Sequence, residues 1–68
     1  MKNLQNNVHE LRQNEGLTQQ QLADILDVTR QTVIAIEKGN YTPSVALALS
    51  IAKYFEQSVE SIFFYEKK

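Results

Sequence analysis

The stretch QQQLADILDVTRQTVIAIEK, residues 19–38, decides the fold because it divides into two helical segments around a short break. Thr18 stands just before it as an N-cap, and Gln21, three residues later, completes a capping-box pattern. An apolar stripe follows at Leu22, Ala23, Ile25 and Leu26. These signals predict a helix over residues 19–26.

A second helix follows the break at Asp27 and Val28. Thr29 offers another N-cap oxygen and Gly39 is available to end the helix, which predicts a helix over residues 30–38. Two helices joined by a turn of about three residues have the geometry of a helix-turn-helix. Apolar residues stand where two steeply crossing helices must meet, at Leu22, Ala23, Val28, Val33 and Ile36.

The flanking segments also carry helical patterns. Leu4, Val8 and Leu11 recur at helical spacing and predict a first helix over residues 5–14. Downstream, either Thr42 or Ser44 can cap a fourth helix in YTPSVALALSIAKYF. Because that helix is apolar nearly all round, we expect it to be the central one.

The end of the chain is less regular. Ser58 caps a short fifth helix that runs through Phe63. The tail FFYEKK is too short for another helix, and its aromatic residues suit an edge strand. The sequence therefore predicts one all-α domain, residues 1–68, with five helices and at most a small two-stranded ribbon.

Size and composition restrict the function. The chain has 68 residues, 43% of them apolar, a net charge of −1 and an isoelectric point near 5.7. That charge argues against a general polyanion binder, so any nucleic-acid role must depend on local charge. With no cysteine and one histidine, no structural metal or cofactor is expected. No apolar run could span a bilayer and no secretion signal is evident, which indicates a cytoplasmic protein without a membrane partner.

The segment LTQQQLADILDVTRQTVIAIEKGNYTPS resembles the Cro and phage-repressor type of helix-turn-helix regulator, the xenobiotic response element family. The matching motifs are the LTQ..LA opening, the V.RQT turn, the IEKG ending and the Pro-Ser that follows. LALSIAKYF and SVESIF look like the fourth and fifth helices of this lambda-repressor-like fold, so the resemblance covers nearly the whole chain. It looks closest to small single-domain regulators of the cytolysin-repressor kind, whose tail forms a small sheet with the N-terminal residues.

The resemblance makes the helix over residues 30–38 a recognition helix for the DNA major groove. Arg30 and Gln31 would then begin the base contacts, since Arg can bind guanine and Gln adenine through paired hydrogen bonds. Arg30 has phosphate binding as its alternative. Ile34 and Ala35 lie one turn further along, where apolar groups can meet a thymine methyl. For Ile34 the alternative is protein packing.

Other roles also come from the resemblance. The implied phosphate contacts are Gln19, Thr29, Thr32, Lys38, Asn40 and Tyr41. Arg12 and Glu37 match a family ion pair that would orient the recognition helix, with phosphate contact as the second role for Arg12. Two positions depart from the family pattern, because Asp27 and Glu56 stand where Gly is usual. Asp tolerates the left-handed backbone conformation better than Glu, so Glu56 should cost stability.

These observations predict a DNA-binding transcriptional repressor that acts as a homodimer on a palindromic operator. A single short helix makes few base contacts, and two half-sites about one helical turn apart supply both affinity and specificity. The dimer contact is expected at Ile62, Phe64 and Tyr65, with the tail 64–68 taking part. Three successive aromatic residues cannot all enter one small core.

Two other classes of function were weighed. An enzyme is not indicated, because His9 and Glu10 are adjacent on a helix and do not face one another, and no nucleophile accompanies them. The alternative is a helix-turn-helix protein-interaction module, such as an antitoxin or anti-repressor, with weak DNA binding. The acidic balance of the chain keeps that alternative open.

Overall fold

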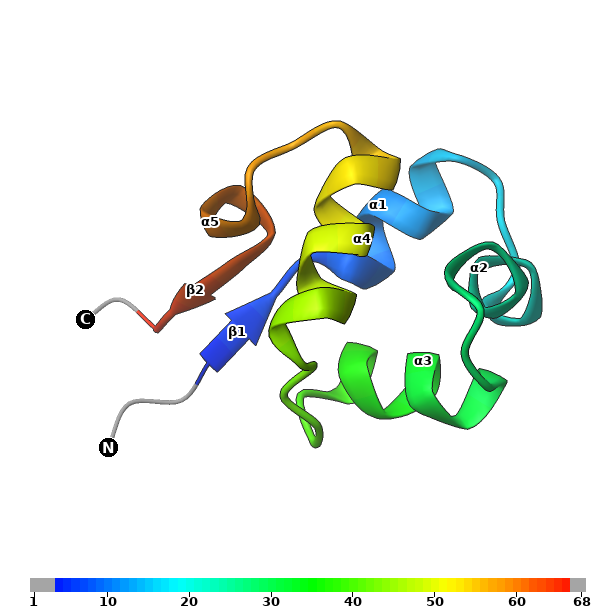
Figure 1. The fold of residues 1–68 in the computed structure, drawn as a ribbon, viewed down its shortest axis with the longest axis horizontal. Coiled ribbons are helices and arrows are strands. Elements are labelled where there is room, and N and C mark those ends of the chain that lie inside the picture. The colour runs from blue at the N-terminus through cyan, green and yellow to red at the C-terminus, as the bar shows by residue number, and fades with distance from the viewer. Residues whose placement is uncertain (1–3, 67–68) are drawn as a thin grey trace.

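The computed structural model describes residues 4–66 as five helices and a two-stranded ribbon (Figure 1). In chain order these are β1 (Leu4–Asn6), α1 (Val8–Asn14), α2 (Gln19–Leu26), α3 (Arg30–Lys38), α4 (Val45–Phe55), α5 (Val59–Ile62) and β2 (Phe63–Tyr65). The ribbon and α2 lie at opposite ends of the molecule. The predicted all-α class with a small terminal ribbon is confirmed.

The two helices of the deciding stretch have the predicted bounds because their caps form as the sequence indicates. Thr18 Oγ1 accepts from the backbone N–H of Gln21 at 3.0 Å, and Gln21 Oε1 accepts from the N–H of Thr18 at 2.8 Å. Thr29 Oγ1 accepts from the N–H of Thr32 at 3.3 Å. Of the two candidate caps for α4, the structure uses Ser44, whose Oγ accepts from Leu47.

All four turns between successive helices use the same backbone motif. A residue with positive φ lies within two residues of the end of each preceding helix, and the N–H of the residue after it donates to a carbonyl five residues earlier. Glycine fills the left-handed position at Gly16 and Gly39. Asp27, with φ of 59°, and Glu56, with φ of 57°, fill it in the other two turns. The Gly positions of the family pattern therefore keep their backbone conformation here without Gly.

The first helix is shorter than predicted. Helical spacing placed Leu4 on its stripe, but residues 4–6 form β1 and pair antiparallel with β2, with Leu4 opposite Tyr65. Leu4 packs against the core from the strand, so burial alone did not distinguish strand from helix. Helix α5 likewise ends at Ile62, because Phe63 already belongs to β2. Both predicted helix bounds are wrong for the same reason, which is that the residues at the helix end belong to the ribbon.

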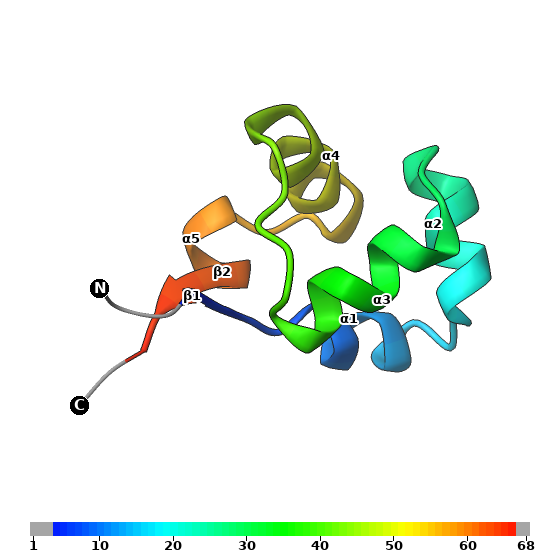
Figure 2. The same ribbon diagram turned by 90° about the horizontal axis from the view of Figure 1, so that it is seen from below.

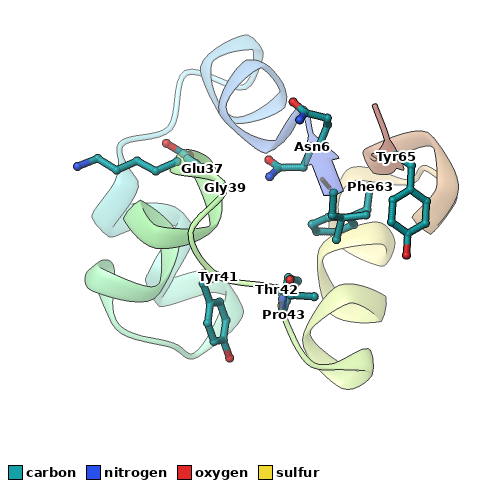
Figure 3. Close-up of a pocket in the computed structure, with 11 residues that line it drawn as sticks. Asn6, Glu37, Gly39, Tyr41, Thr42, Pro43, Phe63 and Tyr65 are labelled. Carbon is teal, nitrogen blue, oxygen red and sulfur yellow. The ribbon is translucent and has the colours of Figure 1, made fainter. Parts of the chain in front are cut away.

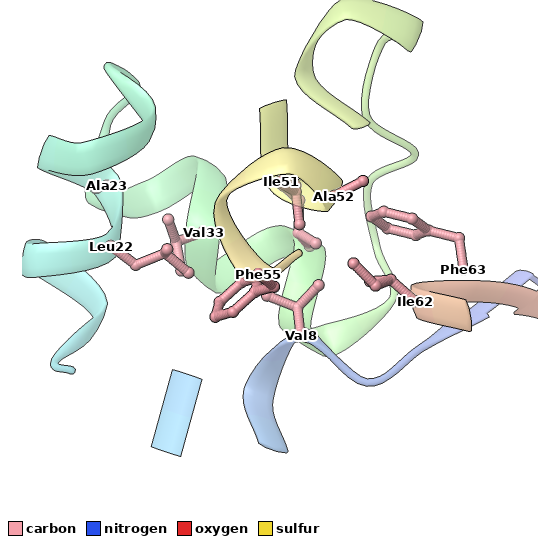
Figure 4. Packing of buried hydrophobic residues seen from close by; sticks show 10 residues of the cluster. Val8, Leu22, Ala23, Val33, Ile51, Ala52, Phe55, Ile62 and Phe63 are labelled. Atoms are coloured by element: carbon pink, nitrogen blue, oxygen red, sulfur yellow. The ribbon is translucent and has the colours of Figure 1, made fainter. Parts of the chain in front are cut away.

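The core forms where the helices converge (Figure 4). Val8 from α1, Leu22 from α2, Val33 from α3, Ile51 from α4 and Ile62 from α5 are almost completely inaccessible to solvent. The other buried apolar members are Ala23, Ile36, Ala52, Phe55 and Phe63. Such a small core fixes which faces meet, but apolar contact is not directional.

Helix α4 is less enclosed than its composition suggested. Ile51, Ala52 and Phe55 are buried, whereas Val45 is 77% exposed and Leu49 is 57% exposed. The helix packs on α2 and α5 and leaves its remaining face open. The helix expected to be the central one therefore buries one face in the core and leaves the other exposed, because too few elements are available to cover it.

We expect Glu56→Gly to stabilise the domain by about 1 kcal/mol, because Gly lacks the Cβ that makes the left-handed conformation costly. Urea unfolding followed by circular dichroism measures the change, and the slope with urea should stay constant. Asp27→Gly is the matched control. It should stabilise less, since Asp tolerates this conformation better, and a larger gain at Asp27 would contradict the explanation.

Candidate nucleic-acid interface

Helix α3 lies along one side of the molecule, with its C-terminal end toward the ribbon (Figure 2). Val33 and Ile36 face inward and are buried. Arg30 and Gln31, at the other end, are exposed, and Ile34 and Ala35 are half-buried. The first turn of α3 therefore presents one guanidinium and one amide to the surroundings. Both groups can form paired hydrogen bonds with base edges.

The six residues expected at phosphates fall into three places. Thr29 and Thr32 lie at the start of α3, where their hydroxyl oxygens are 3.0 Å apart. Lys38, Asn40 and Tyr41 are exposed at the end of α3 and in the loop that follows. Gln19 is separate and half-buried, at the first position of α2. Polar donors thus flank α3 at both ends.

Behind α3, the structure brings Arg12 and Glu37 together in a two-point contact. Arg12 Nε donates to Glu37 Oε2 at 2.6 Å, and Arg12 Nη2 donates to Glu37 Oε1 at 3.1 Å. The two side chains are only 9% and 5% exposed. Arg12 Nη1 also donates to the carbonyl of Leu17, at 2.8 Å. The guanidinium therefore joins α1, the loop before α2 and the last turn of α3.

This contact changes the protonation equilibria of both groups. Burial alone would raise the pKa of Glu37, but hydrogen bonds from Arg12, Gln19 and His9 and the positive charge of Arg12 outweigh it, so the pKa is lowered. The pKa of Arg12 is raised, chiefly by its hydrogen bond to Glu37. Both residues are therefore ionised around neutral pH. We expect the pair to orient α3 more than it adds net stability, because desolvation offsets much of the attraction.

Two further side chains complete a network around Glu37. Gln19 Nε2 donates to Glu37 Oε1 at 3.2 Å, which ties the start of α2 to the end of α3. His9 Nδ1 lies 3.0 Å from Arg12 Nη2 and 3.2 Å from Glu37 Oε1. That nitrogen accepts from Arg12 when unprotonated and donates to Glu37 when protonated. Sequence reasoning missed His9, although its spacing of three residues from Arg12 on one helix was a usable signal.

A groove of about 610 Å³ opens between the end of α3 and the ribbon (Figure 3). Tyr41 and Tyr65 stand on opposite sides of it, with Thr42 and Pro43 between them. Asn6, from β1, also lines the groove, and its Nδ2 donates to the carbonyl of Ile36 in α3 at 2.9 Å (Figure 3). The groove therefore separates the loop after α3 from the ribbon without separating Asn6 from α3.

The residues expected at a dimer contact are not equivalent. Ile62 is completely buried in the core of its own chain, so its side chain is not available to a partner, and its proposed role there is withdrawn. Phe64 is 40% exposed and Tyr65 is 62% exposed. Strand alternation turns these two side chains to opposite faces of the ribbon. The expected aromatic contact is thus divided between two surfaces.

Other kinds of site find no support in the part of the chain that the structure describes. Within residues 4–66, no group of three or more His, Cys, Asp or Glu side chains could hold a metal ion. In the same range, no helix is long and apolar enough to cross a membrane.

Two helices joined by a tight turn, the second with an exposed polar first turn, are the arrangement of the helix-turn-helix class of DNA-binding protein. The chain belongs to the helix-turn-helix family HTH_3, whose model matches residues 8–62. This confirms the resemblance to Cro and phage-repressor regulators seen in the sequence.

Its relatives are regulators from bacteria and archaea. The uncharacterized HTH-type transcriptional regulator YgzD of Bacillus subtilis is 48% identical over 65 residues, which cover 96% of this chain and 98% of that protein. The uncharacterized HTH-type transcriptional regulator MJ0272 of Methanocaldococcus jannaschii is 59% identical over 51 residues, covering 75% and 77% of the two chains.

Solved structures share the fold. The restriction-modification controller protein C.AhdI from Aeromonas hydrophila superposes with a TM-score of 0.70 at 28% identity, over 79% of this chain and 78% of that one. A transcriptional regulator from Listeria innocua superposes with a TM-score of 0.75 at 25% identity, over 94% of this chain and 64% of that one.

We expect Arg12→Met to destabilise the domain by about 3 kcal/mol, because it leaves the Glu37 carboxylate buried without its main partner. The double variant Arg12→Met/Glu37→Met should recover a large part of that loss, since no uncompensated charge remains. Chemical unfolding of the two single variants and the double variant measures the coupling. Strictly additive losses would show that the two side chains do not act as a pair.

Acid should weaken the domain partly through Glu37. Because the folded-state pKa of Glu37 is lowered, its contribution is complete above the unfolded-state pKa of about 4.3 and is lost as the pH falls below that value. Unfolding free energies of wild type and Glu37→Gln, measured between pH 6 and pH 3, should therefore converge on acidification. A constant difference across that range would contradict the assignment.

Proposed function

We propose that this protein is a sequence-specific transcriptional repressor that binds an inverted-repeat operator as a homodimer. The observation that carries the proposal is the exposed first turn of α3, which presents Arg30 and Gln31 while the opposite end of the helix is held by the Arg12–Glu37 pair. A reading surface needs side chains that are free on a backbone that is fixed. Here both belong to one nine-residue helix, with exposed side chains in its first turn and the Arg12–Glu37 pair at its last.

The expected chemistry follows from the order of residues along the helix. Arg30 contacts guanine O6 and N7 and Gln31 contacts adenine N6 and N7, while Ile34 and Ala35 approach thymine methyl groups. Thr29, Thr32, Lys38, Asn40 and Tyr41 contact phosphates on either side, with Gln19 reaching the backbone from α2. Glu37 accepts hydrogen bonds from Arg12 and Gln19. Its negative charge is therefore largely compensated and repels the DNA phosphates less.

Dimerisation supplies what one helix lacks. A single module of this size buries little DNA surface, and two copies on half-sites one helical turn apart double the contacts. Phe64 and Tyr65 are the exposed aromatic side chains that we assign to the partner contact. The protein then acts in the cytoplasm, where its operator is accessible. The net charge of −1 implies that few phosphates are neutralised by Lys or Arg, so most of the proposed phosphate contacts come from neutral donors.

A specific observation supports the second candidate, a protein-interaction module. Val45 and Leu49 stand one turn apart on the open face of α4, and both are more than half exposed. Such a face suits a partner helix. We prefer the DNA-binding function because α3 combines side chains suited to base edges with the buried Arg12–Glu37 pair at its other end. The exposed face of α4 offers apolar side chains alone.

Selection from random duplex DNA tests the choice. We expect an enriched palindrome with half-sites about 10 base pairs apart, and Arg30→Ala or Gln31→Ala should each weaken binding to it by roughly 10- to 100-fold. Gln20→Ala is the matched control and should bind like wild type, because Gln20 is an exposed glutamine on α2 whose side chain donates to Asp24. Recovery of no preferred sequence would favour the interaction module.

The salt dependence of the selected complex gives an independent check. Each phosphate that a Lys or Arg side chain neutralises contributes about −0.9 to the slope of log affinity against log salt in B-DNA, whereas a contact from a neutral donor does not. A slope near −10 would contradict the proposed reliance on neutral donors.

A further inference from the structure

Asn6, the last residue of β1, uses both ends of its side-chain amide. Nδ2 donates to the carbonyl of Ile36 at 2.9 Å, and Oδ1 accepts from the backbone N–H of Val8 at 3.0 Å. One amide thus joins the start of α1 to the last turn of α3, across 30 positions of sequence. Asn6 is half-buried, which shields these bonds in part from water.

The carbonyl that Asn6 holds is adjacent to the Arg12–Glu37 pair. Ile36 O also accepts from the N–H of Gly39 at 3.0 Å, within the turn that ends α3. Two consecutive residues of α3 are therefore held by hydrogen bonds, Ile36 through its main chain and Glu37 through its side chain. A bond to a carbonyl fixes the backbone itself, whereas Glu37 retains rotatable bonds between its carboxylate and α3.

The position of Asn6 is set by the ribbon. Its backbone pairs with buried Phe63, and the N–H of Asn7 donates to the carbonyl of Ile62 at 3.1 Å. The path of contact therefore runs from β2 to Asn6 and from Asn6 to the end of α3. Only an amide places a donor and an acceptor on one short side chain at this spacing.

We propose that Asn6 is a positioning residue for DNA reading, which holds α3 at the angle at which Arg30 and Gln31 reach base edges. The inference rests on the proposed function. Helix α3 is about 13 Å long, so a tilt of about 10° at its anchored end moves the first turn by about 2 Å. A shift of that size removes paired hydrogen bonds to bases, which need donor–acceptor distances near 3 Å.

The test compares Asn6→Asp with Gln5→Glu. The first keeps the acceptor for Val8 and removes the donor to Ile36, while the second adds the same charge on the opposite, exposed face of the same strand. Residual dipolar couplings of backbone amides, measured on the free proteins, report the angle between α3 and α2. We expect a changed angle in Asn6→Asp and an unchanged one in Gln5→Glu, and equal angles would overturn the proposal.

DNA binding gives the second readout, as the ratio of affinities for the selected operator and for unrelated duplex. Asn6→Asp should lower this ratio about tenfold relative to Gln5→Glu. A substitution that only destabilises the fold leaves the ratio unchanged as long as the protein is folded. An unchanged ratio overturns the proposal. If Asn6→Asp does not fold, Asn6→Ala is read by the same two measurements against wild type.

The two hypotheses fail in different ways. If wild type selects no duplex sequence, the proposed function fails, and the dipolar couplings alone decide whether Asn6 sets the angle of α3. If wild type selects an operator and neither Asn6 variant changes the angle or the ratio, the function stands and the role of Asn6 is rejected.

Discussion

The ion pair between Arg12 and Glu37 is the interaction on which the proposed reading surface depends, because it joins the last turn of α3 to α1 and to the loop before α2. The apolar core specifies which faces of the helices meet, but a cluster of ten buried apolar residues leaves the angle of a short helix weakly determined. We propose that the directional bonds at the last turn of α3 supply that angle. The hydrogen-bonded side chains of the interior are therefore concentrated at the last turn of α3, the helix proposed to read DNA.

The local parts of this structure could be predicted from the sequence. Caps at Thr18 and Thr29 placed α2 and α3 correctly, because N-caps and their partners lie within three residues of one another. The left-handed residues Asp27 and Glu56 were expected where the family pattern has Gly. Each of these features depends on neighbours in sequence, and sequence patterns describe such neighbours well.

The errors have a common cause, which is pairing over long distances in the chain. Leu4 fits a helical stripe, yet its partner in the ribbon is Tyr65, and no local pattern shows that pairing. Similarly, the sequence of α4 does not say which of its apolar residues lacks a neighbour, and Val45 remained uncovered. The contact of His9 with Glu37 also spans 28 positions, so only its relation to Arg12 on the same helix was visible.

The ribbon also determines the order in which this domain can be completed. Strand β1 has no partner until Tyr65, which pairs with Leu4, has left the ribosome. At about 5–20 residues per second, synthesis of the intervening chain takes several seconds. Helices α2 and α3 can pack on one another earlier, since their contacts are closer in sequence. A nascent chain can thus form its helix-turn-helix first and its ribbon last, when the two ends of the domain meet.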